Sequence, residues 1–335
     1  MIDAQIANDA TYACSAVAAL LVIIRLVVSK FQPKTFDLSF FVATFGLAAI
    51  IGRVIVTYYV LKFGTANDVL AKMKTTRVTL TNEQMDQIKL GSILSLFVRI
   101  LTTSSLWSMN LLLLLLYRRF VAHLPWMKNA IKGTVAFIVL SYVAVIAATF
   151  LECRPFHLYW QIMPSPGNCV KAYSQTMVQC ISNIVTDVIL MAISVPILFI
   201  QGSRTSHKVR IFGLIALGAF CIVVTCLRLT YIFKAGSLQA TRTFWASISI
   251  LVASVVANAP VIYGSLKIMR RGKTSSYAYG YGTTNMRTGG VTTIPGDEEK
   301  GGGITKTIVT VQGDNESKTS DDIPLRPMHR NSVVF

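Results

Sequence analysis

Seven long apolar segments separated by polar connectors dominate the chain. Each is continuously apolar over about 20 residues, the length a helix needs to cross the roughly 30 Å hydrocarbon core of a bilayer. Because the backbone finds no water there, and because the segments do not alternate as barrel strands do, each is expected to be an α-helix. The predicted spans are residues 10–28, 38–61, 93–116, 135–151, 176–200, 211–233 and 244–268.

The composition favours lipid as the solvent for this chain. Of its 335 residues, 53% are hydrophobic and only 14% are charged, which is too apolar for an ordinary soluble core. The formal charge of +17 is spread over connectors and the C-terminal part, so we expect contact with a membrane surface and no nucleic acid. The predicted fold class is all-α, a polytopic membrane protein with a seven-helix bundle.

Three regions follow from this pattern. Residues 1–9 form a short N-terminal segment, residues 10–270 the membrane domain, and residues 271–335 a tail rich in Gly, Ser, Thr and charge. The tail has too few apolar residues to bury a core and is expected to be disordered.

The distribution of basic residues predicts the orientation, because short cytosolic loops are enriched in Lys and Arg. An outer N-terminus and a cytosolic C-terminus place most basic connector residues in the cytosol: Lys30, Lys34, Arg118, Arg119, Lys128, Lys132, Arg204, Lys208 and Arg210. The connector 62–89 is a basic exception, but the rule weakens in long loops. We expect a multi-pass protein of the plasma membrane rather than of an internal membrane.

The connector between the fourth and fifth spans has a distinctive pattern, formed by Cys153, Pro155, Trp160, Pro166, Gly167 and Cys169. In the expected orientation both cysteines face an oxidising compartment, where a bridge closing this loop would contribute roughly 3 kcal/mol. The alternative is two free thiols at helix ends. The flanking Pro, Gly and Trp residues favour the disulfide.

This loop pattern resembles that of the fungal rhodopsin-like domain proteins, a family of seven-helix, receptor-like integral membrane proteins of filamentous fungi. The resemblance covers roughly residues 10–270. Beyond the loop it includes Asn183, Asp187, Pro196, Lys208, Gly218 and Arg228, and it ends near Pro260. It implies a receptor-like role. The chain departs from the family where Asn110 and Leu112 replace a frequent Lys-x-Ser, and where no acidic residue closely follows Trp245.

Charged residues inside the spans are the main candidates for a site, because a charge at membrane depth is costly. Counting about 1.5 Å per residue places Arg53, Arg99, Asp187 and Arg228 in one layer, roughly 20 to 27 Å above the cytosolic edge. Asp187 is expected to pair with Arg228, helped by Asn183, either as a structural pair or as part of a site. Arg53 and Arg99 either extend to the outer interface or line an outward cavity for an anionic or polar ligand.

Two prolines inside the spans, Pro196 and Pro260, are candidate hinges, because proline frees a backbone carbonyl and bends a helix. The segment from Asn258 to Tyr263 loosely resembles the Asn-Pro-x-x-Tyr motif of animal receptors. An ordinary helix bend is the preferred explanation of this segment.

Three classes of function can be compared on these features. The first is a receptor-like protein that senses an extracellular small molecule and signals to a cytosolic partner through its loops. The alternatives are a transporter or a structural membrane protein without signalling, and the nearly pure hydrocarbon of residues 111–116 and 189–199 disfavours a transport path. An enzyme is not expected, because the four histidines are scattered. We expect no metal and no cofactor, including retinal, since the seventh span has no lysine before Lys267.

Overall fold

The computed structural model describes residues 3–30, 38–73, 81–120, 125–162, 167, 169–200 and 205–278. Residues 1–273 form one compact unit, and of the second unit, 274–335, the structure describes only residues 274–278. The predicted disordered tail therefore lies almost entirely outside the described residues. The helices are α1 (Ala4–Lys30), α2 (Leu38–Phe63), α3 (Ala66–Met73), α4 (Asn82–Phe120), α5 (Pro125–Leu151), α6 (Tyr173–Ile200), α7 (Thr205–Lys234) and α8 (Gln239–Ala278), with short 3₁₀ turns at Phe156–Tyr159 and Cys169–Lys171.

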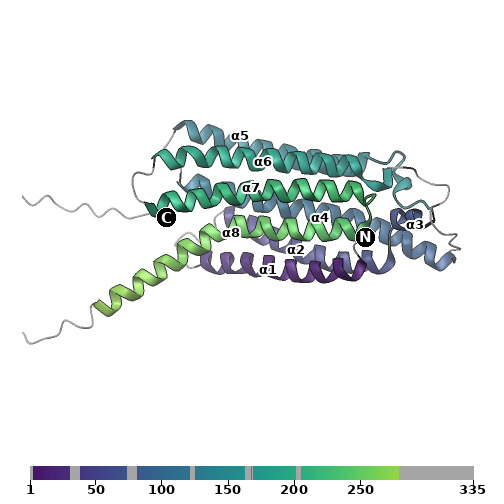
Figure 1. Cartoon of the computed structure of the whole chain (residues 1–335), viewed down its shortest axis with the longest axis horizontal. Helices are drawn as coiled ribbons and strands as arrows, with labels where there is room; N and C mark the ends of the chain where they lie inside the picture. The colour runs from purple at the N-terminus through teal and green to yellow at the C-terminus, as the bar shows by residue number, and fades with distance from the viewer. Residues whose placement is uncertain are drawn as a thin grey trace, which may run out of the picture. The chain divides into compact units, whose positions relative to one another are not determined.

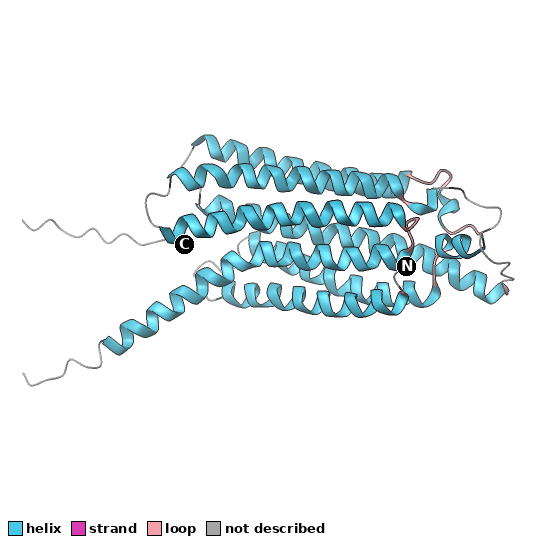
Figure 2. Cartoon of the chain, viewed as in Figure 1, coloured by secondary structure: helices cyan, strands magenta, loops and turns pink. Residues whose placement is uncertain are grey.

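Seven of these helices, all except α3, are long and apolar enough to cross a membrane. The described residues contain only helices and short loops (Figure 2), so the predicted all-α, seven-helix fold is confirmed. Large apolar side chains cover the outside of the bundle; Leu140 is 68% exposed and Phe41 59% exposed. Such a surface would aggregate in water and is suited to lipid.

The helices of the bundle run side by side, and the N-terminus, α3 and the loop between α5 and α6 gather at one end (Figure 1). We call this end the disulfide end, because the loop holds the bridge described below. The other end, where α4 finishes and α5 begins, is the opposite end.

Helix α4 is the centre of the bundle. In an apolar stretch of 18 residues within α4, 78% of the residues are buried, against 22% to 39% in the corresponding stretches of the other six spans. Its inner positions carry both apolar residues, such as Leu112 and Leu114, and small polar residues, such as Ser105 and Ser108. Small residues of this kind allow membrane helices to approach closely and to share hydrogen bonds.

The packing of α2 against α4 depends on glycines. A Cβ at Gly46 of α2 would lie 3.1 Å from Ser108 Cβ, and a Cβ at Gly91 of α4 would lie only 2.0 Å from the carbonyl oxygen of Gly64. Gly64 itself has a φ of +75°, which glycine adopts without the Cβ penalty. The two helices thus meet backbone to backbone near the disulfide end.

Helix α4 begins eleven residues before the predicted span 93–116. Thr81 and Gln84 form a reciprocal capping box: the Thr81 N–H donates to Gln84 Oε1 at 3.2 Å, and the Gln84 N–H donates to Thr81 Oγ1 at 3.4 Å. The first turns are polar, so a search for apolar residues alone misses them.

Candidate functional site

A stripe of polar residues follows the inner face of α6. Gln175, Gln179, Asn183 and Asp187 recur every four residues, so their side chains share one face of the helix. The Gln175 Nε2 donates to Gln179 Oε1 at 3.4 Å, and the Asn183 Nδ2 donates to Asp187 Oδ2 at 3.2 Å. We call these four residues the α6 polar stripe.

The α6 polar stripe is hydrogen-bonded to two neighbouring helices. Toward α4, Gln179 Nε2 donates to Thr103 Oγ1 at 3.2 Å and Asn110 Nδ2 donates to Asn183 Oδ1 at 3.2 Å. Toward α7, Asn183 Nδ2 also lies 3.3 Å from Thr225 Oγ1. The stripe therefore forms two groups of hydrogen-bonded residues, one around Gln179 and one around Asn183, which tie α6 to α4 and α7.

Arg53 lies on α2, on the other side of α4. Its side chain is fully buried: Nε donates to Thr102 Oγ1 at 3.2 Å, and Nη2 donates to the Thr243 carbonyl at 3.1 Å and to Ser247 Oγ at 2.9 Å. The Ser247 hydroxyl is in turn 3.0 Å from that of Thr11 on α1. Arg53 thus turns into the bundle and links α2, α4 and α8, instead of extending to the interface.

Three more arginines lie toward the disulfide end. Arg228 of α7 donates from Nη2 to Gln179 Oε1 at 3.0 Å. Arg242 of α8 donates to Gln175 Oε1 at 3.2 Å and to the Lys171 carbonyl at 3.3 Å. The third is Arg99 of α4. We call Arg53, Arg99, Arg228 and Arg242 the arginine layer.

Arg99 of α4 faces the loop between α5 and α6. Its guanidinium carbon lies 5.8 Å from the centroid of the Tyr159 ring, a distance typical of a cation–π contact. Its Nε and Nη1 atoms are buried, and no described residue offers them a hydrogen-bond acceptor.

The structure does not form the predicted contact between Asp187 and Arg228. Within the described residues the one salt bridge joins Lys89 to Asp86, at 2.9 Å. The pairing of α6 with α7 explains this, because Gln179 contacts Arg228 and Asn183 contacts Thr225. Asp187 lies eight residues, or about 12 Å, beyond Gln179 along α6, where it lines a cavity together with Cys221. An error of a few residues in either span boundary is enough to produce the wrong pairing.

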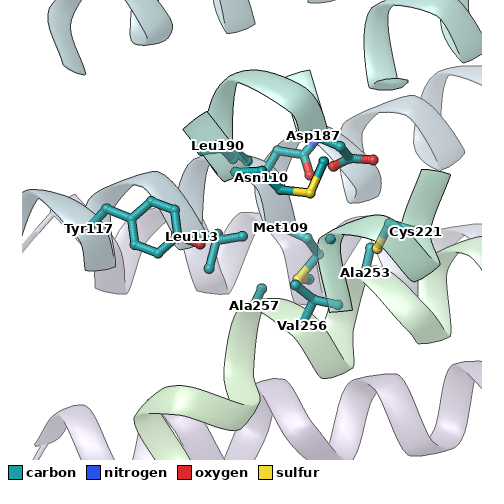
Figure 3. Close-up of a pocket in the computed structure, with 12 residues that line it drawn as sticks. Met109, Asn110, Leu113, Tyr117, Asp187, Leu190, Cys221, Ala253, Val256 and Ala257 are labelled. Carbon is teal, nitrogen blue, oxygen red and sulfur yellow. The ribbon is translucent and has the colours of Figure 1, made fainter. Parts of the chain in front are cut away.

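Two adjoining cavities lie between α4, α6, α7 and α8. The first is near the arginine layer and is lined by polar groups of Gln179, Asn183, Asp187 and Arg228 and by apolar residues such as Val252. The second shares Asn110, Asp187, Cys221 and Ala253 with it and extends to Tyr117. Figure 3 shows Asp187 and Asn110 facing Met109, Ala253 and Val256 across the narrow second space. In each, the space open to the centre of a water-sized molecule is about 20 Å³, enough for about one water.

A disulfide joins Cys153 to Cys169, with their Cα atoms 5.1 Å apart, and confirms the predicted bridge. The loop that it closes is packed on the disulfide end: Cys153, Tyr159 and Val170 form a buried cluster with Leu96 of α4. Burial raises the pKa of the Tyr159 phenol, and the nearby Arg99 guanidinium opposes this rise. The phenol also donates a hydrogen bond to the Thr149 carbonyl.

The other loop residues singled out in the sequence have structural roles where they are described. Pro155 precedes the first 3₁₀ turn, and Trp160 follows it and packs edge-on against Phe156, with ring centroids 5.5 Å apart. Gly167 has a φ of +78°, a conformation that favours glycine. Pro166 lies outside the described residues.

Arg25 is a buried charged residue that the sequence analysis overlooked. It is 5% exposed and donates from Nη1 to the Ala257 carbonyl at 2.7 Å and from Nη2 to Ser39 Oγ at 3.1 Å, with longer bonds to Asn258 Oδ1 and the Leu112 carbonyl. Its position near the end of the first span gives no sign that it points inward. In the structure it joins α1 to α2, α4 and α8.

The two candidate hinges lie within continuous helices. Helix α6 continues past Pro196, and α8 continues past Pro260. Arg25 donates a hydrogen bond to the Ala257 carbonyl of α8, three residues before Pro260. The proline therefore lies close to a hydrogen bond between α1 and α8. Asn258, in the same turn, is fully buried and donates to the Ser254 carbonyl at 2.7 Å.

Seven membrane-length helices and an apolar exterior define this chain as a multi-pass membrane protein. It belongs to the fungal rhodopsin domain family, whose model matches residues 20–271. A search of curated proteins and a search of solved structures gave no match.

Proposed function

We propose that the protein is a receptor-like membrane protein, not an enzyme, which senses a small molecule in the cavities between α4, α6, α7 and α8. The observation that carries the proposal is the α6 polar stripe. Its residues Gln179, Asn183 and Asp187 are hydrogen-bonded and line the first cavity. Polar groups at membrane depth are costly, so their arrangement around a cavity favours a binding role.

Helix α8 is the element best suited to move when a ligand binds. Its backbone keeps farther from its neighbours than those of the tightly packed α2 and α4. Its residues Ile250, Val256 and Ala257 pack in the core, and hydrogen bonds from Arg25 and Arg53 reach its backbone carbonyls. These hydrogen bonds can be exchanged for others when the helix moves. A ligand that binds one arrangement of α8 more tightly than another would shift the population toward it.

The direction of signalling follows from the proposed topology. We place the disulfide end outside and the opposite end, with its basic connectors, in the cytosol, where a signalling partner would dock. The plasma membrane is the proposed location, since it exposes the disulfide end to external molecules.

Topology is tested first, with a C-terminal reporter and an impermeant maleimide. In a Cys226→Ser background, which removes an exposed thiol, Cys153 and Cys169 should label from outside only after reduction. Labelling from the cytosolic side would overturn the orientation and with it the sensing proposal.

Sensing is tested by measuring helix movement across the opposite end. Spin labels are placed at Lys128→Cys on α5 and Tyr263→Cys on α8, both exposed. A library of small molecules is first screened for those that raise the unfolding temperature.

A stabilising compound should change the label distance, and Asn183→Ala should abolish the change. Thr230→Ala, which alters an exposed threonine of α7 bonded to its own helix, should not. Uptake of the compound into vesicles without a distance change would favour the transporter alternative.

A further inference from the structure

Positive charge in the arginine layer is not neutralised by direct contact. Arg242 lies within electrostatic range of Arg99 and Arg228, and also of the carboxylates Glu152 and Asp68. Arg228 is in turn within range of Arg53. Among the described residues, no member of this layer forms a salt bridge. Like charges gathered at membrane depth repel each other strongly, because the surroundings screen them poorly.

Two carboxylates near the layer, Glu152 and Asp68, are hydrogen-bonded to backbone groups. Glu152 accepts hydrogen bonds from the N–H groups of Ser174 and Gln175, at 2.7 Å and 3.2 Å, at the start of α6. Asp68 accepts from the N–H of Gln239 at 2.9 Å, at the start of α8. Both stabilise helix N-termini. In the described part of the chain, the hydrogen-bond acceptors of Arg53, Arg228 and Arg242 are all neutral groups.

Arg228 combines this excess charge with an unused donor. It is 7% exposed and lines the first cavity. Its Nη2 is bonded to Gln179, whereas its Nε has no hydrogen-bond acceptor among the described residues. A buried guanidinium without a counter-ion carries a large desolvation cost. An anion in the cavity would meet both the unsatisfied charge and the unsatisfied N–H.

We propose that the ligand of this site is a small organic monoanion, whose carboxylate or phosphate group binds Arg228 and whose apolar part lies against Leu106, Val224 and Val252. This deepens the proposed function and rests on it. Guanidinium groups bind such oxyanions through paired hydrogen bonds, and the three apolar residues line the same cavity. Asp187 at the far end disfavours a second negative charge, so the ligand carries its charge at one end.

The cavity as observed accepts little more than a water molecule, so the side chains that line it must rearrange when the anion enters. The anionic group can come from a free molecule or from a lipid headgroup, since both present the same chemistry.

The test measures the unfolding temperature of the full chain in phosphatidylcholine nanodiscs. Sodium hexanoate replaces sodium chloride at constant ionic strength, and adipate, hexanol and inorganic phosphate serve as comparisons. Hexanoate should raise the unfolding midpoint saturably, by about 2 °C or more, while adipate and neutral hexanol should not. Discs that contain phosphatidylglycerol, without free anion, test the lipid source.

Variants assign the effect to one residue. Arg228→Gln should lose the hexanoate or phosphatidylglycerol response, Arg228→Lys should keep part of it, and Arg118→Gln, which alters an exposed arginine at the end of α4, should keep all of it. An unchanged response in Arg228→Gln overturns the proposal. If neither Arg228 variant folds, equal stabilisation by hexanoate and hexanol in the wild type overturns it instead.

The spin-label distances separate this inference from the receptor function. Hexanoate binding that needs Arg228 but leaves the α5–α8 distance unchanged supports the anion site and refutes sensing. A neutral compound that changes the distance equally in the wild type and in Arg228→Gln supports sensing and refutes the anion site.

Discussion

Replacing Gly91 with alanine tests the backbone contact between α2 and α4. The new Cβ would lie 2.0 Å from the Gly64 carbonyl oxygen and 3.2 Å from Phe63 Cβ, whereas carbon and oxygen normally stay about 3.3 Å apart or more. The two helices must therefore separate by about 1 Å. Overpacking of this kind costs about 1 to 3 kcal/mol, and we expect the upper value because the obstructing atom belongs to the backbone.

The effect is measured as the midpoint temperature of unfolding of the detergent-solubilised full chain. The readout is the fraction of protein that stays monodisperse after heating. A loss of about 3 kcal/mol should lower the midpoint by about 5 °C. The matched control is Gly133→Ala in α5, an exposed position where a Cβ meets no atom within 4 Å. Alanine there removes the helix penalty of glycine, about 0.5 to 1 kcal/mol, so the midpoint should rise slightly. Midpoints that are equal in the two variants, or lower for Gly133→Ala, would refute the packing argument.

Three further changes have defined outcomes. Cys153→Ser should lower the unfolding free energy by about 3 kcal/mol, and a reductant should then lower the midpoint of the wild type but not of the variant. Arg25→Lys replaces the five N–H donors of a guanidinium by a single ammonium that cannot reach acceptors on three helices. The distribution of spin-label distances between α1 and α8 should therefore broaden. An unchanged width would contradict this role of Arg25. Tyr159→Phe should cost about 0.5 to 1.5 kcal/mol through the lost hydrogen bond. Because the folded-state pKa of Tyr159 is raised, the phenol contributes fully to the unfolding free energy below a pH of about 10. This contribution is lost at higher pH. The wild type should therefore lose more stability above this pH than Tyr159→Phe does.

The seven helices could be predicted because a long apolar run has few alternatives in a bilayer. The disulfide was also predictable, from cysteines at the ends of one short loop. The polar start of α4 was not found by hydropathy, although the Thr81–Gln84 capping box marks it in the sequence.

The site was predicted less well, because it depends on how helices pair. Asp187 and Arg228 were placed in one layer by counting from uncertain span ends, and the register between α6 and α7 separates them. The four-residue spacing of Gln175 and Gln179 before Asn183 and Asp187 was visible, and it marks the α6 polar stripe. The inward direction of Arg25 depends on carbonyls of other helices, which no local pattern reveals.

The attachment of α8 has a genetic consequence. Arg25 and Arg53 donate to the main-chain carbonyls of Ala257 and Thr243, and every amino acid supplies a carbonyl. Replacing the side chain at position 257 or 243 therefore leaves that acceptor in place, while replacing either arginine removes the donor. In a saturation mutagenesis screen, we expect losses of function to concentrate at Arg25 and Arg53. Positions 257 and 243 of α8 should tolerate small residues of many kinds.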